Sequence, residues 1–215
     1  AANNVGVGYH ALCTNTTGAG NISVGAFSLD ANTTGDDNVG IGLFALSTNT
    51  TANENTAVGA YSISANTTGT KNTAIGKGSL QTNTTASCNT AVGYNALIEN
   101  TTGADNTAVG ALALDANTTG SQNIAIGKCS LTANTTANNN VAVGHRSMET
   151  NTTGVENVAI GEQTLRYNQT GSCNTAIGKA AGLNNTTAAN NTAVGVEALK
   201  DNTTGTVNTA MGRQS

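Results

Sequence analysis

The sequence has 215 residues and a formal net charge of −4, with 9% charged residues, 3% aromatic residues, 26 glycines and no proline. Charged residues make up about a quarter of an ordinary globular chain, so this composition is unlike that of a typical enzyme domain. No apolar run approaches the roughly 20 residues of a membrane span, and no basic cluster offers nucleic acid a track of phosphate contacts. The composition therefore disfavours both a membrane-inserted protein and a nucleic-acid-binding domain.

A repeat of 17 residues organises the whole chain. We number its positions 1 to 17, with Ala1 at position 1, which gives twelve full copies and most of a thirteenth. We expect residues 1–215 to form a single repeat array, an uncapped fragment of a longer fibrous protein. The tetrapeptide Asn-Thr-Thr-Gly, or a close variant, starts at position 15 of each full copy: Asn15, Asn32, Asn49, Asn66, Asn83, Asn100, Asn117, Asn134, Asn151, Asn168, Asn185 and Asn202.

The first predicted element of each copy is a strand at positions 4 to 8, which read Asn-Thr-Ala-Val-Gly at residues 106–110. Alternating residue size with β-branched residues at positions 5 and 7 is typical of a strand. A short second strand is expected around the Ala-Leu pair at positions 11 and 12, followed by an Asn-Thr-Thr-Gly corner. One such unit cannot bury its apolar face alone, so stacked copies predict an all-β fold, a parallel β-solenoid.

The predicted core consists of columns of identical residues. We expect Val or Ile at position 7, such as Val109, and Leu at position 12, such as Leu114, to face the coil interior. The small residues at positions 6 and 8 would then form an outward stripe that suits close approach of another chain. The alternative is a coil so thin that position 6 lies inside.

Three kinds of residue at fixed positions carry further structural predictions. Position 4 is Asn in all thirteen copies, including Asn106, and we expect amide ladders there and at position 15. Position 8 is always Gly, including Gly110, which predicts a positive φ. All charged residues fall at positions 2, 3, 9, 10, 13 and 14, so these positions are expected at the surface.

These units resemble two known kinds of repeat. Asn-Thr-Ala-Val-Gly at 106–110, followed by Ala113, Leu114 and Asn-Thr-Thr-Gly at 117–120, is similar to the head repeats of trimeric autotransporter adhesins and to repeats of phage tail fibres that precede an endosialidase-type chaperone domain. The resemblance implies a left-handed parallel β-roll, usually a homotrimer. The chain departs from the adhesin head in its longer Asn-Thr-Thr connection, and it lacks that family's neck and coiled-coil stalk.

Residues with catalytic or metal-binding chemistry are sparse, and the sequence predicts no enzyme, no metal site and no cofactor. His10 and His145 lie eight copies apart and are expected to be solvated. Lys71 interrupts the acidic residues near position 3, which also favours solvation over cation binding; these residues are Asp36, Asp37, Glu54 and Asp105. The cysteines are too far apart along the stack for disulfides, which predicts free thiols at Cys13, Cys88, Cys129 and Cys173.

The Asn-Thr-Thr corners allow two functional interpretations besides a structural one. Each of the twelve position-15 asparagines is an N-glycosylation sequon, which would matter in a secreted eukaryotic protein. The preferred interpretation is a corner in which Asn tolerates turn geometry and Thr hydroxyls bond to the backbone. Regularly spaced threonines also suggest an ice-binding function, but the adjacent Thr16 and Thr17 would point to opposite sides of a strand.

The most individual surface feature is a strip of aromatic residues at positions 9 and 10: Tyr9, Phe27, Phe44, Tyr61 and Tyr94. Such a strip can stack on sugars or contact another protein, and the alternative is that it covers the coil edge. We interpret the chain as a structural or adhesive fibre segment, extracellular, on a cell surface or on a virion, that self-associates as a homotrimer or filament and presents a host- or surface-binding edge. The alternative is a carbohydrate-binding module, or an ice-binding protein.

Overall fold

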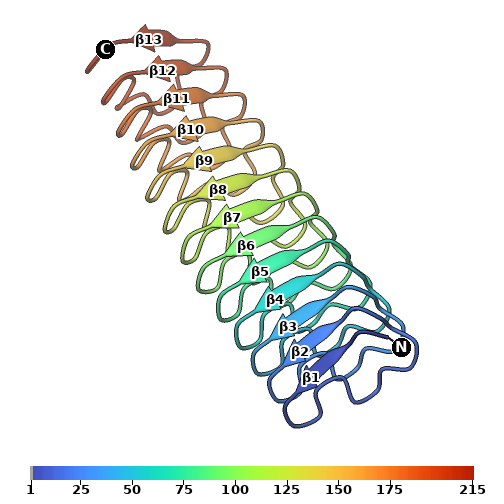
Figure 1. Cartoon of the computed structure of the whole chain (residues 1–215). Helices are drawn as coiled ribbons and strands as arrows, with labels where there is room; N and C mark the ends of the chain where they lie inside the picture. The colour runs from blue at the N-terminus through green and yellow to red at the C-terminus, as the bar shows by residue number, and fades with distance from the viewer. Residues whose placement is uncertain (1) are drawn as a thin grey trace. The chain divides into compact units, whose positions relative to one another are not determined.

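A computed structural model describes residues 2–215, in two units that are described separately, one ending at Asn106 and the other spanning Thr107–Ser215. Each 17-residue coil contributes one short strand (Figure 1). The first unit contains β1 (Val5–Val7), β2 (Ile22–Val24), β3 (Val39–Ile41), β4 (Thr56–Val58), β5 (Thr73–Ile75) and β6 (Thr90–Val92). The second contains β7 (Thr107–Val109), β8 (Ile124–Ile126), β9 (Val141–Val143), β10 (Val158–Ile160), β11 (Thr175–Ile177), β12 (Thr192–Val194) and β13 (Thr209–Met211).

Neighbouring strands within each unit pair in parallel, and their register equals the sequence period. In the first unit Ile22 pairs with Val39, and Val39 pairs in turn with Thr56. In the second unit Val158 pairs with Thr175. Equivalent positions of successive coils therefore lie side by side, which confirms the predicted all-β parallel β-solenoid of 17-residue coils.

The strand face that points into the coil is the opposite of the one in the main prediction. The middle strand residue, at position 6, is the buried one: Ala57, Ala74 and Ala108 are all 0% exposed. Position 7 points outward, and Ile75 in β5 is 43% exposed. The predicted apolar column that includes Val109 is thus wrong, because Val109 is only half-buried on the outer face. The thin coil, with position 6 inside, is the arrangement observed.

The narrow interior explains this orientation. A β-carbon built on Gly40, at position 6 of β3, would stand 2.6 Å from Ser28 Oγ and 3.2 Å from Leu29 Cγ, which belong to positions 11 and 12. The opposite wall therefore comes so close that only Gly, Ala or Ser fits at position 6. A Val or Ile side chain has no room there and must point outward.

The leucine column at position 12 is confirmed, but the second strand is not. Leu29, Leu46 and Leu114 are 0% exposed and form the largest apolar part of the interior. Their φ angles are positive, 48° at Leu29 and 54° at Leu114, so this segment is a series of turns. A strand needs negative φ throughout. The turns still bond from coil to coil, as from the Leu29 amide to Ala45 O at 3.0 Å.

Both predicted asparagine ladders are present. At position 15, Asn66 Nδ2 donates to Asn49 Oδ1 in the preceding coil at 2.9 Å and to Gly69 O at 2.9 Å. At position 4, Asn55 Nδ2 donates to the same Gly69 carbonyl at 2.9 Å, and its Oδ1 accepts the backbone N–H of Asn72 at 3.0 Å. Asn55 and Asn66 are 0% exposed, so these hydrogen bonds satisfy amides that would otherwise be costly to bury.

Glycine at position 8 has the predicted positive φ. The angle is 133° at Gly42 and 136° at Gly110, a region that is essentially restricted to glycine. Space is lacking as well, because a β-carbon on Gly42 would lie 2.6 Å from the carbonyl carbon of Gly59 in the next coil. Backbone atoms cannot move aside as a flexible side chain can.

The substitution Gly42→Ala should lower the free energy of unfolding by about 2 kcal/mol, from backbone strain and the clash with the next coil. Equilibrium denaturation monitored by circular dichroism measures this change. Lys77→Ala, which truncates an exposed side chain, is the control and should leave the midpoint unchanged. Equal midpoints for the two variants would contradict the packing described for position 8.

Gly182 interrupts the leucine column of the second unit. It keeps the positive φ of that position, 59°, and Leu183 beside it is only half-buried. A cavity of about 10 Å³ remains, lined among others by Leu165, Gly182 and Leu199. Asn185 Oδ1, which also lines it, is buried and accepts no hydrogen bond. The interior of this coil is therefore incompletely filled.

Gly182→Leu should raise the free energy of unfolding by about 1–2 kcal/mol, because it restores the column and buries a leucine side chain. The new β-carbon would lie 2.8 Å from Leu165 Cδ2, the end of a side chain that can rotate back. Thermal unfolding measures the gain. In the same coil, Gly178→Leu should be destabilising, and a loss of stability in both variants would show that the column cannot be completed.

Candidate binding surface

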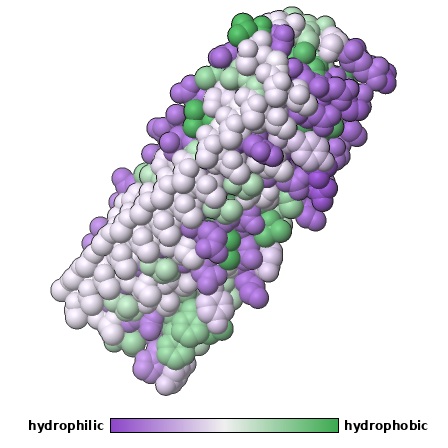
Figure 2. Space-filling view, turned by 180° about the vertical axis from the view of Figure 1, so that it is seen from behind, coloured by the Kyte–Doolittle hydropathy of each residue, from purple (hydrophilic) through white to green (hydrophobic). Residues whose placement is uncertain are grey.

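The coil corners carry the charged and variable side chains, as predicted. Within residues 2–215, no Asp, Glu, Lys or Arg is buried. In the view of Figure 2 most of the surface is pale, the colour of intermediate hydropathy, and purple hydrophilic side chains gather along its margins. The repeat positions that carry charge in some coils are therefore the corner positions 2, 3, 9, 10, 13 and 14, while the strand positions change little from coil to coil.

The structure brings four of the five predicted aromatic residues together. Tyr9 contacts Phe27 edge to face at 5.3 Å between ring centroids, Phe27 stacks on Phe44 at 4.9 Å with 5° between the ring planes, and Phe44 stacks on Tyr61 at 5.4 Å. We call Phe27, Phe44 and Tyr61 the aromatic column. Tyr94 lies outside it and is 53% exposed.

His10 is a member of this cluster that sequence reasoning missed. Its ring lies 4.3 Å from Tyr9 and is stacked on Phe27 at 5.5 Å. The available signal was its repeat position, because His10 shares position 10 with the three residues of the aromatic column. A planar ring at that position continues the stack whether or not it is apolar.

A groove runs between the aromatic column and the corner at positions 13 and 14. Its lining residues are Phe44, Ser47, Thr48, Tyr61, Ser64 and Ala65, and its open volume is about 350 Å³. The groove is shallow and open to solvent, and the surface that it exposes is mostly apolar. Ser47 and Ser64 are stacked, since Ser47 Oγ donates to Ser64 O at 3.3 Å. One wall is thus aromatic, and the hydroxyls of Ser47 and Thr48 on the other wall donate to backbone carbonyls.

Asp30 and Gln81 extend the hydroxyl-bearing wall by one coil at each end, because they share position 13 with Ser47 and Ser64. Asp30 Oδ1 is shielded from solvent and accepts no hydrogen bond. Desolvation raises the pKa of the Asp30 carboxyl above its usual range. At the other end, the aromatic column stops at Gly78, where a β-carbon would meet the side-chain oxygens of Asn95 and Gln81.

The outer face of the strands is the second surface with a distinctive composition. Positions 5 and 7 hold Val, Ile, Thr or Met in every coil and never a charged residue. In the first unit Ile22, Ile41 and Ile75 are 38–43% exposed, and in the second unit Ile160 and Ile177 are each 39% exposed. Surface strands usually alternate apolar inward and polar outward residues, so an uncharged β-branched outer face is unusual.

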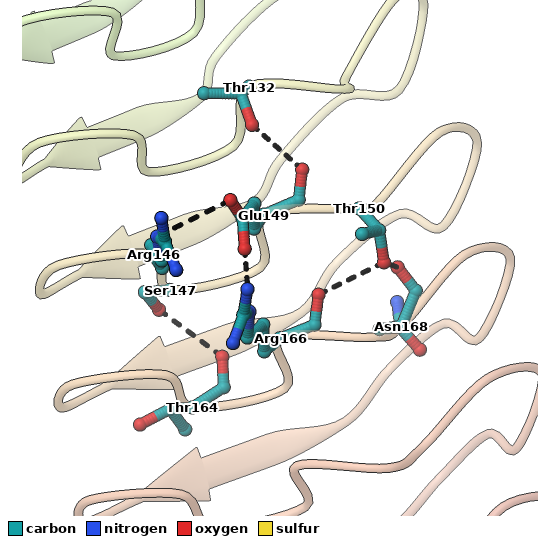
Figure 3. A network of polar contacts seen from close by, with 8 residues as sticks. All are labelled: Thr132, Arg146, Ser147, Glu149, Thr150, Thr164, Arg166 and Asn168. Atoms are coloured by element: carbon teal, nitrogen blue, oxygen red, sulfur yellow. Dashed lines mark hydrogen bonds and ion pairs between the residues drawn. The ribbon is translucent and has the colours of Figure 1, made fainter.

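A cluster of charged residues occupies the corner of the second unit (Figure 3). Glu149 lies between two arginines, at 2.6 Å from Arg166 Nε and 3.5 Å from Arg146 Nε. Arg166 also lies over the ring of Tyr167, at 5.0 Å from its centroid. Because these side chains are partly exposed, each ion pair contributes at most about 1 kcal/mol. The cluster links successive coils without forming an enclosed site.

The other predicted features give no ligand site among the described residues. Asp36 is exposed, and its Oδ1 accepts the backbone N–H of Ala19 in the neighbouring coil at 2.7 Å. Within residues 2–215, no three His, Cys, Asp or Glu residues are grouped to hold a metal ion. The four cysteines are free, as predicted.

The sequon asparagines are part of the interior. From Asn32 to Asn185 the position-15 side chains are at most 2% exposed, and Nδ2, the atom that would carry a glycan, is used in the ladder. Thr33 Oγ1 donates to Thr50 O at 3.0 Å, so position-16 hydroxyls bond to the next coil. These contacts support the corner interpretation. Position 17 is exposed from coil to coil, and some position-16 threonines, such as Thr50 and Thr67, are exposed beside it.

Cys173 offers a test of side-chain stacking at the corners. Its Sγ lies 3.5 Å from Glu156 Oε2 in the preceding coil, and this hydrogen bond raises the pKa of the thiol. At a given pH a raised pKa means less of the reactive thiolate. Glu156→Gln should therefore speed alkylation of Cys173 severalfold between pH 7 and 8, while Cys88 reacts as before. Mass spectrometry of the modified peptides measures both rates, and an unchanged Cys173 rate would contradict the contact.

The geometry defines the class of protein as a parallel β-solenoid repeat protein with a β-branched outer strand face and an aromatic groove at one corner. Comparison with protein-family models, with curated proteins and with solved structures found no significant match. Within the described residues, no helix is long and apolar enough to cross a membrane.

Proposed function

We propose that the chain is a rigid segment of an extracellular structural or adhesive fibre, on a cell surface or a virion, that associates with copies of itself. Rigidity is supported by the coil-to-coil hydrogen bonds within each unit. Strand, turn and corner all take part, as in Thr73 N to Asn89 O at 2.8 Å, Leu80 N to Ala96 O at 3.0 Å and Thr67 N to Thr84 O at 2.9 Å. Such a chain keeps its length under load better than one held by side chains alone.

The single observation that supports self-association is the outer strand face. Val, Ile and Thr at positions 5 and 7 present an uncharged surface that repeats from coil to coil. Exposed apolar patches of this kind mark interaction sites, and apolar surface is enriched in the interfaces of homo-oligomers. A second copy offers a face of identical spacing, so side chains of two copies can interdigitate along the stack. The resemblance to trimeric adhesin heads favours three copies.

Solution mass tests this proposal. Light scattering after size exclusion should give about three times the chain mass of 21.3 kDa. Ile75→Glu places a charge on the strand face and should shift the protein toward the monomer, because a buried unpaired charge is costly. Leu43→Glu is a matched control, since Leu43 is 42% exposed and Ile75 is 43% exposed, but Leu43 lies off the strand face. A wild-type monomer at micromolar concentration would refute self-association.

A further inference from the structure

We propose that a rank of threonines at position 17 binds the surface of ice. The rank runs from Thr17 to Thr102 in the first unit and from Thr119 to Thr204 in the second, with one threonine in each coil. Every one of these threonines is exposed. The inference goes beyond the proposed function and concerns a different surface, because position 17 lies outside the strand face at positions 5 and 7.

Position 17 does not vary, although it is exposed. Exposed position 3, by comparison, holds Asp37, Glu54 and Lys71 in three successive coils. Position 17 is threonine in every full copy of the repeat. Such constancy at the surface is expected where the ligand itself repeats with the period of the coils.

The hydroxyl groups of this rank are free to bind water. At position 16, Thr67 Oγ1 donates to Thr84 O in the next coil at 2.9 Å. At position 17, the Oγ1 atoms of Thr34, Thr51 and Thr68 make no hydrogen bond to any residue of the described range. A hydroxyl can both donate and accept, so each coil offers water a two-way hydrogen-bonding group beside a methyl group.

The framework holds these side chains at a regular spacing within each unit. Thr34 N donates to Thr50 O at 3.2 Å and Thr68 N donates to Thr84 O at 3.3 Å, so the backbone of the rank is bonded to the next coil. Threonine is also stiff at χ1 because it is β-branched. Paired strands lie about 4.8 Å apart, which sets the repeat distance along the rank. That distance is close to the repeat of water molecules in the basal plane of ice.

The chemistry of the corner favours ice over other ligands. Positions 15, 16 and 1 flank the rank and never carry a charged residue, and Thr50 and Thr67 at position 16 widen the exposed surface. A charged group would orient water around itself and disturb an ice-like arrangement. A dissolved small molecule needs a concave pocket, which a row of exposed side chains does not form. Threonine is also uncommon among the residues that anchor protein interfaces.

Thermal hysteresis, the gap between the melting and freezing points of a seeded ice crystal, tests this inference with the full chain. The wild type should open such a gap and should be incorporated into a growing ice hemisphere. Thr51→Lys should at least halve the gap, because a lysine projects above the rank and carries a strongly hydrated charge. Leu43→Lys is the control, since Leu43 is 42% exposed in the same unit and lies off the rank. Circular dichroism near 0 °C establishes that each variant remains folded.

Absence of thermal hysteresis in the wild type, with exclusion from the ice hemisphere, would overturn the inference. Equal gaps in Thr51→Lys and Leu43→Lys would overturn the assignment to position 17, as would a loss in Ile75→Glu with none in Thr51→Lys. Solution mass measured on the same samples keeps the two proposals separate. An oligomer that ice excludes refutes this inference alone, whereas a monomer that binds ice refutes self-association alone.

Discussion

The width of the coil interior is the constraint on which the rest of the structure depends. Between the strand and the opposite turns there is room for one leucine layer and for a single carbon or hydroxymethyl group at position 6, as the close approach of Leu29 to Gly40 shows. Larger strand residues are consequently placed on the outside. The same narrow interior excludes a conventional apolar core, and much of the buried volume is filled by asparagine.

Buried asparagines are stable here only because the chain repeats. An unpaired buried amide costs about 1–3 kcal/mol, while each satisfied hydrogen bond contributes about 1 kcal/mol net. In the stack, Asn49 Oδ1 accepts from Asn66, and Asn66 Oδ1 accepts from Asn83 in the same way. Along this stretch each coil thus supplies the partner that its neighbour needs. Where the leucine column is interrupted beside Asn185, an amide oxygen is left without a donor.

Much of this fold could be predicted from the sequence because the period places equivalent residues together. The parallel solenoid, the asparagine ladders, the positive φ of Gly110, the buried Leu114 and the free thiols all follow from that placement. The sequence could not show which face of the strand points into the coil, since alternation determines only which residues share a face. Absence of charge at positions 5 and 7 fits a core as well as an exposed interface.

Two local features also escaped prediction for physical reasons. Leu114 has a φ of 54°, and leucine gives no sequence signal for a conformation that it ordinarily avoids. His10 is exposed, as predicted, but its ring also stacks on Phe27, a contact that was not predicted. For the groove, the aromatic residues were found from the sequence, but the wall of Asp30, Ser47 and Ser64 was not. Pairing positions 10 and 13 across a corner requires the turn geometry.

Stacking also limits which side chains each column can hold. Equivalent side chains of successive coils lie about 4.8 Å apart. The side chains of one column must therefore either pack against side chains of their own kind or alternate in charge. Rings satisfy the first condition, which allows Phe27, Phe44 and Tyr61 to follow one another. Glu162 with Lys179, at 3.1 Å, satisfies the second. Asp37 and Glu54, like charges in successive coils, are both exposed, so solvent screens their repulsion. An uninterrupted aromatic column is therefore a low-cost way to build an extended apolar wall on this framework, whereas a binding site that needs several like charges would work against the stack that carries it.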